Sequence, residues 1–227
     1  MLIKAKRSEF NVKLLLVVFL LADLVYTYFQ NYYSIYLDGD MSAIVIATKA
    51  YKKVLEDPFG FRAFFNHETY AATNRFFIHW SMQFYCKNAP AFFHSFLNPV
   101  DSVFAAMAFV RTGFQLALIV LISFYCSGSK NIWNIKFLTA ASVVTPFFQI
   151  AGYEEFMGLT SGAITYTFFY SLPLICLLLY FKPFYFRYVL NKEIKFHTLR
   201  NIYLLFVMLA ICFGGSLGAP VILIFVH

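Results

Sequence analysis

Long apolar stretches divide this sequence, and they constrain the fold more than any other feature. Runs of roughly 18 or more apolar residues recur, and a helical run of this length crosses a hydrocarbon core about 30 Å thick. Lipid offers the backbone no water to bond, so spans are expected to be helices. Only 13% of the residues are charged, against about a quarter in a soluble domain. The sequence therefore predicts an all-α, polytopic integral membrane protein.

The apolar runs predict about five membrane-spanning helices within one transmembrane domain, residues 1–227. They are expected at about 12–30, 102–126, 136–152, 161–181 and 201–219. A loop over about 31–101 separates the first two, and loops of that length without structure are rare. Within it the spacing predicts an amphipathic helix over 40–56 that lies in the membrane interface, and a second helix over 70–87.

The basic residues predict the orientation. Short loops rich in Lys and Arg stay on the cytoplasmic side. Eleven of the 18 Lys and Arg residues fall at one end of the expected spans: Lys4, Lys6, Arg7, Lys13, Lys130, Lys136, Lys182, Arg187, Lys192, Lys195 and Arg200. We therefore expect a multi-pass protein of the inner, cytoplasmic membrane with its N terminus inside. The net charge of +7 is then a topology signal, and nucleic acid is not expected as a partner.

The chain ends inside an apolar run. The segment 221–226 is too short to span a membrane alone, so it either completes a broken fifth helix or begins a sixth. We expect the sequence to be the N-terminal portion of a larger protein, with a natural five-span protein as the alternative.

The tripeptide Asp38-Gly39-Asp40 follows the first span. Two carboxylates at this point can hold a divalent cation, which prefers oxygen ligands, or accept the proton of an attacking hydroxyl. Asp38 and Asp40 are therefore the candidate catalytic residues and a speculative metal site. The alternative is that Asp40 caps a helix that begins at Met41 and that Asp38 is an ordinary loop acid.

Glu154 and Glu155 form a second acidic pair, in the next outer loop. In the expected topology they lie on the same membrane face as Asp38 and Asp40. If the third span packs near the first, the four acids converge on one site. Otherwise they are solvated loop acids.

Asp23 and Arg111 are expected near the middle of the membrane, where a lone charge is costly and a partner is required. We predict that they form an ion pair or share polar neighbours such as Gln115. Such a pair either links the first two spans or serves function directly.

The long loop also carries cations that can hold a phosphate: Lys49, Lys53 and Arg75. His79, one turn after Arg75, can transfer protons, although an interfacial histidine without such a role is the plainer interpretation. No P-loop, G-x-S-x-G, dinucleotide-binding glycine pattern or H-E-x-x-H is present. The four cysteines indicate neither a disulfide framework nor a zinc site.

A cytoplasmic N terminus, a first span, an acidic motif directly after it and a long first outer loop with interfacial helices resemble the GT-C class of membrane glycosyltransferases. The resemblance covers about residues 10–181, and Asp38-Gly39-Asp40 is its most specific match. It implies sugar transfer from a polyisoprenyl-phosphate donor at the outer membrane face. Asp38 or Asp40 would be the first-loop acid, and Glu154 or Glu155 the acid of the second outer loop. Members of this class usually have more spans.

The sequence leaves open whether the protein is an enzyme. The alternative is a transporter, or an assembly subunit of a larger membrane complex, in which Asp23 and Arg111 line a polar path or dock a partner helix. No cofactor is required by either interpretation, although a divalent cation fits the first.

Overall fold

The computed structural model describes residues 2–70, 75–149, 162–192, 197–215 and 218–226. Within these ranges the chain is helical apart from its loops and one isolated bridge between Tyr36 and Ala163. The helices are α1 (Leu2–Ser34), α2 (Gly39–Val45), α3 (Lys49–Glu56), α4 (Phe61–Asn66), α5 (Phe76–Phe93), α6 (Pro99–Ser127), α7 (Ile135–Val144), the 3-10 turn η1 (Thr145–Phe148), α9 (Ile164–Tyr166), the π-helical turn η2 (Thr167–Ser171), α10 (Leu172–Tyr188), α11 (His197–Cys212) and α12 (Gly218–Val226). The predicted fold class is confirmed.

Three of the described helical segments are long and apolar enough to cross a membrane: Glu9–Ser34, Pro99–Ser127 and Ile164–Tyr188. They correspond to the first, second and fourth expected spans. The third and fifth expected spans are the shorter apolar helices Ile135–Phe148 and His197–Cys212. Proline explains the short third helix, because the α-helix of α7 gives way to the 3-10 turn at Pro146.

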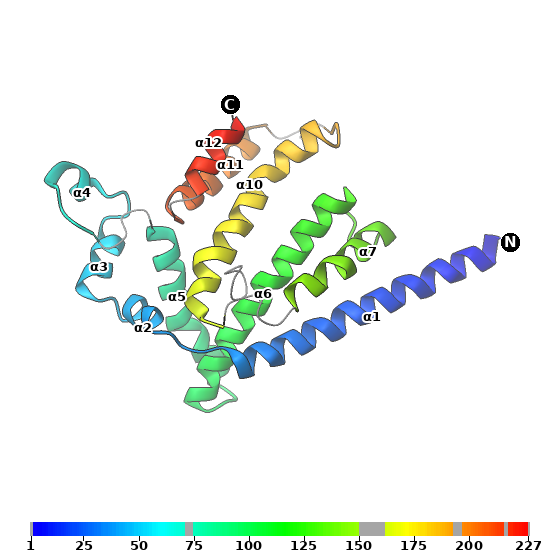
Figure 1. Cartoon of the computed structure of the whole chain (residues 1–227), viewed down its shortest axis with the longest axis horizontal. Helices are drawn as coiled ribbons and strands as arrows, with labels where there is room; N and C mark the ends of the chain where they lie inside the picture. Colours follow the sequence, from blue (N-terminus) through cyan, green and yellow to red (C-terminus); the bar gives the residue numbers. More distant parts are fainter. Residues whose placement is uncertain (1, 71–74, 150–161, 193–196, 216–217, 227) are drawn as a thin grey trace.

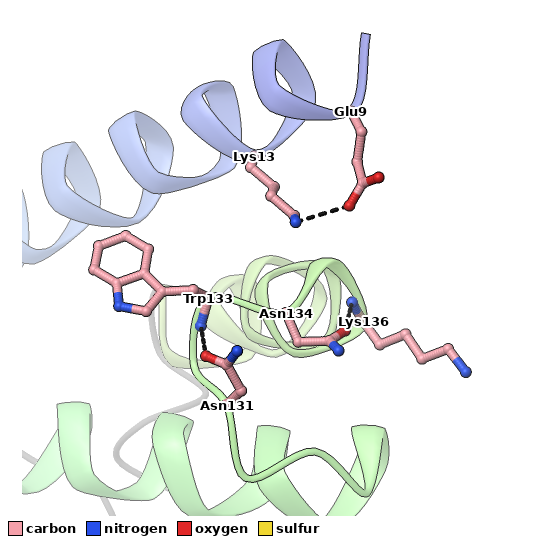
Figure 2. A network of polar contacts seen from close by, with 6 residues as sticks. All are labelled: Glu9, Lys13, Asn131, Trp133, Asn134 and Lys136. Atoms are coloured by element: carbon pink, nitrogen blue, oxygen red, sulfur yellow. Dashed lines mark hydrogen bonds and ion pairs between the residues drawn. The ribbon is translucent and has the colours of Figure 1, made fainter. Parts of the chain in front are cut away.

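α6 is the central helix and packs against α1, α5, α7 and α10 (Figure 1). α1 leaves this bundle, and its N-terminal half projects alone (Figure 1). The side chains of that half suit lipid, since Leu14 is 53% exposed and Leu15 is 69% exposed. α1 contacts α7, and the part of α1 that carries Lys13 and the start of α7 with Lys136 lie at one end of the bundle (Figure 2). We call this the basic end.

The opposite end, where α1 stops at Ser34 and α6 starts at Pro99, carries the long first loop, and we call it the loop end. The single helix expected over 40–56 is wrong: Ala47 has a left-handed φ of 45°, and the chain breaks there into α2 and α3. Ile44 and Val54 are buried, and both helices pack on α5. Their apolar face therefore covers protein.

The second loop helix also differs from expectation. It was expected over 70–87, but α5 runs from Phe76 to Phe93 and continues through Pro90. Its buried face joins Ile78 and Met82 to Met107 of α6 and Phe168 of η2. This cluster is the core of the loop end, and it fixes the loop helices over the start of the bundle.

Candidate functional site

A row of polar side chains runs along the C-terminal half of α1. Asp23, Thr27, Asn31 and Ser34 recur at three- and four-residue spacing and so share one helix face. Thr27 and Asn31 are buried, although the rest of this helix is largely exposed and apolar. Polar groups are costly in a membrane and usually face the bundle interior, where they mark functional paths. We call this row, with the residues that it bonds, the polar column.

Hydrogen bonds join the polar column to the neighbouring helices. The Gln149 side-chain amide, which follows η1, donates to the Thr27 hydroxyl at 2.6 Å and to the Asp23 carboxylate at 3.1 Å. The Asn31 amide donates to the Thr112 hydroxyl of α6 at 2.9 Å. The polar column therefore ties α1 to two other parts of the bundle through side chains that sit among apolar ones.

A polar cavity opens beside the column. It is small, with a volume of about 10 Å³, room for about one water molecule, and most of its lining side chains are polar. The lining residues are Thr27, Gln30, Asn31, Ser34, Arg111, Gln115, Phe148 and Gln149. Arg111 is 3% exposed and Gln115 is 5% exposed, so both are held inside the bundle.

Asp23 and Arg111 lie at different heights. Arg111 is followed by Thr112, whose hydroxyl accepts a hydrogen bond from Asn31 of α1. Asn31 lies about 12 Å along α1 from Asp23 and one turn before α1 ends at Ser34. Arg111 is therefore nearer the loop end than the sequence suggested, because α6 extends beyond the end of α1. The ion pairs among the described residues are Glu9–Lys13, Lys52–Glu56 and Lys53–Glu68. Asp23 instead bonds Gln149, which lines the cavity together with Arg111 and Gln115.

Asp38 is held firmly at the loop end. Its carboxylate caps α2 by accepting from the Met41 backbone N–H at 2.8 Å. It also accepts from the hydroxyl of buried Thr165 at 2.6 Å and from the Thr165 backbone N–H at 3.2 Å. The alternative in which Asp40 caps the helix is wrong, since α2 begins at Gly39. Asp38 thus joins the first loop to the start of the third long span.

Asp40 lies in the first turn of α2 and is exposed. Within the described part of the chain, no donor is assigned to its carboxylate. Of the two acids in the motif, Asp40 is therefore the one whose oxygens remain available to another molecule.

Glu154 and Glu155 lie outside the described residues. The described residues on either side of segment 150–161 both contact the first span or its loop. Gln149 bonds Asp23 and Thr27, and the Gly162 carbonyl accepts from the Tyr36 N–H at 3.1 Å. The segment that carries the second acidic pair thus starts and ends beside the polar column and Asp38.

The three cations of the first loop have different surroundings. Lys53 pairs with Glu68 at 3.2 Å and lies over the Tyr70 ring, whereas Lys49 is exposed. The Arg75 guanidinium lies 5.0 Å from the centre of the Phe169 ring. Lys49 and Arg75 are therefore better placed than Lys53 to meet a phosphate.

His79 is fully buried between aromatic rings. Its imidazole lies edge-on to Tyr51 of α3 at 4.9 Å and to Phe169 at 5.6 Å, measured between ring centres. In the described part of the chain neither ring nitrogen has a hydrogen-bond partner. Burial, and then the nearby Arg75 cation, lower the pKa of His79 to about 4. His79 is thus a neutral packing residue that ties α3 and α5 to η2.

The expected divalent cation finds weak support from these residues. Among the residues that the structure describes, no three His, Cys, Asp or Glu side chains lie together in a way that could hold a metal ion. Asp38 already accepts from three donors. Hard cations take six or more oxygen ligands, so a cation at Asp38 and Asp40 would need further ligands such as water or a substrate phosphate.

Most of the polar column was not recognised in the sequence. The spacing of Thr27, Asn31 and Ser34 after Asp23 is a signal that could have found it, since it repeats every three to four residues within an apolar helix. Thr112 and Gln149 carry no such pattern, and only the packing of α6 and η1 on α1 reveals them. Comparisons of the chain with protein-family models, with curated proteins and with solved structures give no match.

Proposed function

We propose that this protein is a glycosyltransferase-like protein of the cytoplasmic membrane, with its N terminus inside and its reaction centre at the loop end. One observation supports the proposal: Asp38, just after the end of α1, bonds Thr165 at the start of the third long span, and a polar cavity is lined by the last turns of α1. A lipid-borne sugar phosphate would meet water at this level of the membrane.

The reaction is attack of an acceptor hydroxyl on the anomeric carbon of a polyisoprenyl-phosphate-linked sugar. A new bond forms between the acceptor oxygen and the anomeric carbon while the bond from that carbon to the phosphate oxygen breaks. Asp40 takes the hydroxyl proton, since its carboxylate is exposed. Polyisoprenyl phosphate leaves, and Lys49 and Arg75 stabilise its charge.

Asp38 has a positioning role in this scheme. Its bonds to Met41 and Thr165 fix the loop that presents Asp40. Asp23 and Arg111 act through the polar column, which holds the end of α1 in place beside the cavity.

A second candidate function is favoured by one observation. The three bonds to Asp38 give this acid a complete structural role. A non-enzymatic subunit or transporter would need nothing more from it, and the polar column would then line a path or receive a partner helix.

Proteoliposomes distinguish the two candidates. The full-length protein is reconstituted with a series of radiolabelled polyisoprenyl-phosphate sugars, and release of polyisoprenyl phosphate is measured against protein-free vesicles. The transferase proposal expects release that depends on the protein for at least one donor. Release equal to that of protein-free vesicles for every donor, from protein shown to be folded, contradicts it.

A further inference from the structure

A second concentration of charge lies at the basic end, remote from the loop end. Two aromatic residues of α6 and two of α10 form a cluster there. Phe124 and Phe186 have ring centres 5.3 Å apart, and Tyr125 and Tyr185 have ring centres 4.8 Å apart. The Tyr185 hydroxyl donates to the Tyr125 carbonyl at 2.7 Å, and the Tyr125 hydroxyl donates to the Leu178 carbonyl at 2.6 Å. These bonds lock the ends of the two helices together.

Two lysine ammonium groups rest on this cluster. Lys130 Nζ lies 3.9 Å from the centre of the Phe186 ring, and Lys182 Nζ lies 5.3 Å from that of Phe124. Among the described residues neither ammonium has a carboxylate partner. Each presents three N–H donors, so the aromatic cluster holds both cations by ring faces and leaves their donors available.

The turn that carries Lys130 is well ordered. Gly128 ends α6 with a left-handed φ of 62°, and it packs closely on Leu190. The Ser129 hydroxyl accepts from the Asn131 N–H, and the Asn131 side chain accepts from the Trp133 N–H (Figure 2). The backbone that carries Lys130 is therefore held by these contacts.

The surroundings are basic. Three further cations are exposed here: Lys136 at the start of α7, Arg187 in the last turn of α10 and Lys192 just after α10. Glu9, the acidic side chain that the structure describes at this end of α1, is paired with Lys13 at 2.7 Å (Figure 2). The excess of cations at this end makes a positive potential that attracts an anion.

We propose that Lys130 and Lys182 bind the phosphate of an anionic phospholipid such as phosphatidylglycerol. The site lies at the ends of membrane-spanning helices, and Lys130 precedes by three residues Trp133, which is 63% exposed as in an interfacial anchor. Basic pockets between spanning helices recognise anionic headgroups in this way. In the expected topology the lipid belongs to the cytoplasmic leaflet, opposite to the proposed reaction centre.

The test uses Trp133 as the reporter. Trp80→Phe leaves Trp133 as the single tryptophan, and the full chain is placed in phosphatidylcholine bilayers with increasing brominated phosphatidylglycerol. Quenching gives the binding constant relative to brominated phosphatidylcholine. We expect a preference for phosphatidylglycerol that falls about fivefold in Lys130→Gln or Lys182→Gln, and about 25-fold in the double variant. Lys87→Gln, which changes an exposed lysine of α5 at the loop end, is the matched control and leaves the preference unchanged.

Further arms keep the proposal open to refutation. Lys130→Arg retains the charge and should retain the preference for phosphatidylglycerol. High salt should weaken that preference in the protein with both lysines intact. Equal affinity for the two lipids, or equal affinities of Lys130→Gln, Lys182→Gln and Lys87→Gln, overturns the proposal. Inorganic phosphate added to the protein in detergent distinguishes a lipid headgroup from free phosphate. If phosphate raises the thermal midpoint, Lys130→Gln abolishes that rise and no lipid preference is found, the site binds free phosphate. That result would contradict the proposed lipid site.

Discussion

The Asp38 carboxylate accepts a hydrogen bond of 2.6 Å from the Thr165 hydroxyl, across 127 positions of the chain. This bond connects the acidic motif after the first span to the start of the third long span. Thr165 is 3% exposed, so the bond is shielded from water and is stronger than a surface contact.

Thr165→Val keeps the shape of the side chain and removes the hydroxyl donor. We expect a loss of about 1–3 kcal/mol in unfolding free energy, because a partly buried carboxylate loses a donor. Unfolding of the detergent-solubilised protein in a denaturant series measures this. Thr165→Ser retains the hydroxyl and should stay close to wild type; a similar loss in both variants would mean that packing, not the bond, matters here.

The buried His79 predicts a pH dependence. The pKa of His79 is about 4 in the folded protein, against 6.5 for an ordinary histidine. Between these pH values the unfolded chain binds a proton at His79 and the folded chain does not. The unfolding free energy is therefore full above pH 6.5 and falls by about 2 kcal/mol on lowering the pH to 5, and by about 3 kcal/mol at pH 4.

His79→Phe should remove that part of the pH dependence while keeping the aromatic contacts with Tyr51 and Phe169. Denaturant unfolding of both proteins between about pH 7 and pH 5 provides the comparison. Identical slopes in wild type and variant would show that His79 is not the titrating group.

A double-mutant cycle tests whether the polar column couples the helices. Asn31→Ala and Thr112→Ala each remove one partner of the 2.9 Å bond between α1 and α6. We expect a coupling energy of about 0.5–2 kcal/mol, as measured for hydrogen bonds between membrane helices. Additive effects of the two changes would mean that the bond contributes nothing to the fold.

Gly128 predicts a local cost of substitution. Its φ of 62° is strained for residues with a Cβ, and an added Cβ would lie 3.2 Å from Leu190 Cδ2. Gly128→Ala should destabilise the protein by about 1 kcal/mol. Gly113→Ala is the control, because no atom lies within 4 Å of its added Cβ. Equal thermal midpoints for the two variants would contradict the assignment of this turn.

The sequence was sufficient to predict the fold class and the long spans, because helix length and hydropathy are local properties. Pro99 at the start of α6 and Pro146 at the end of α7 also act locally. The break at Ala47 was missed, since the amphipathic spacing continues through it and packing on α5 decides the conformation.

The site was less predictable, because its contacts depend on how the helices pack. The sequence identified Asp38 and Asp40 but did not show which carboxylate is fixed by hydrogen bonds. The donor to Asp38 is Thr165, which lies 127 positions away in the chain. Similarly, counting residues from each helix start placed Asp23 and Arg111 at one depth. It could not account for α6 reaching past the end of α1.

The most direct test of the account is sugar transfer by Asp40→Asn, compared with wild type in proteoliposomes and expressed per folded protein. The account predicts that Asp40→Asn lowers turnover by about 100-fold or more while its thermal midpoint stays that of wild type. Asp38→Asn, in contrast, should lower both stability and turnover. Wild-type turnover in a stable Asp40→Asn variant would contradict the account.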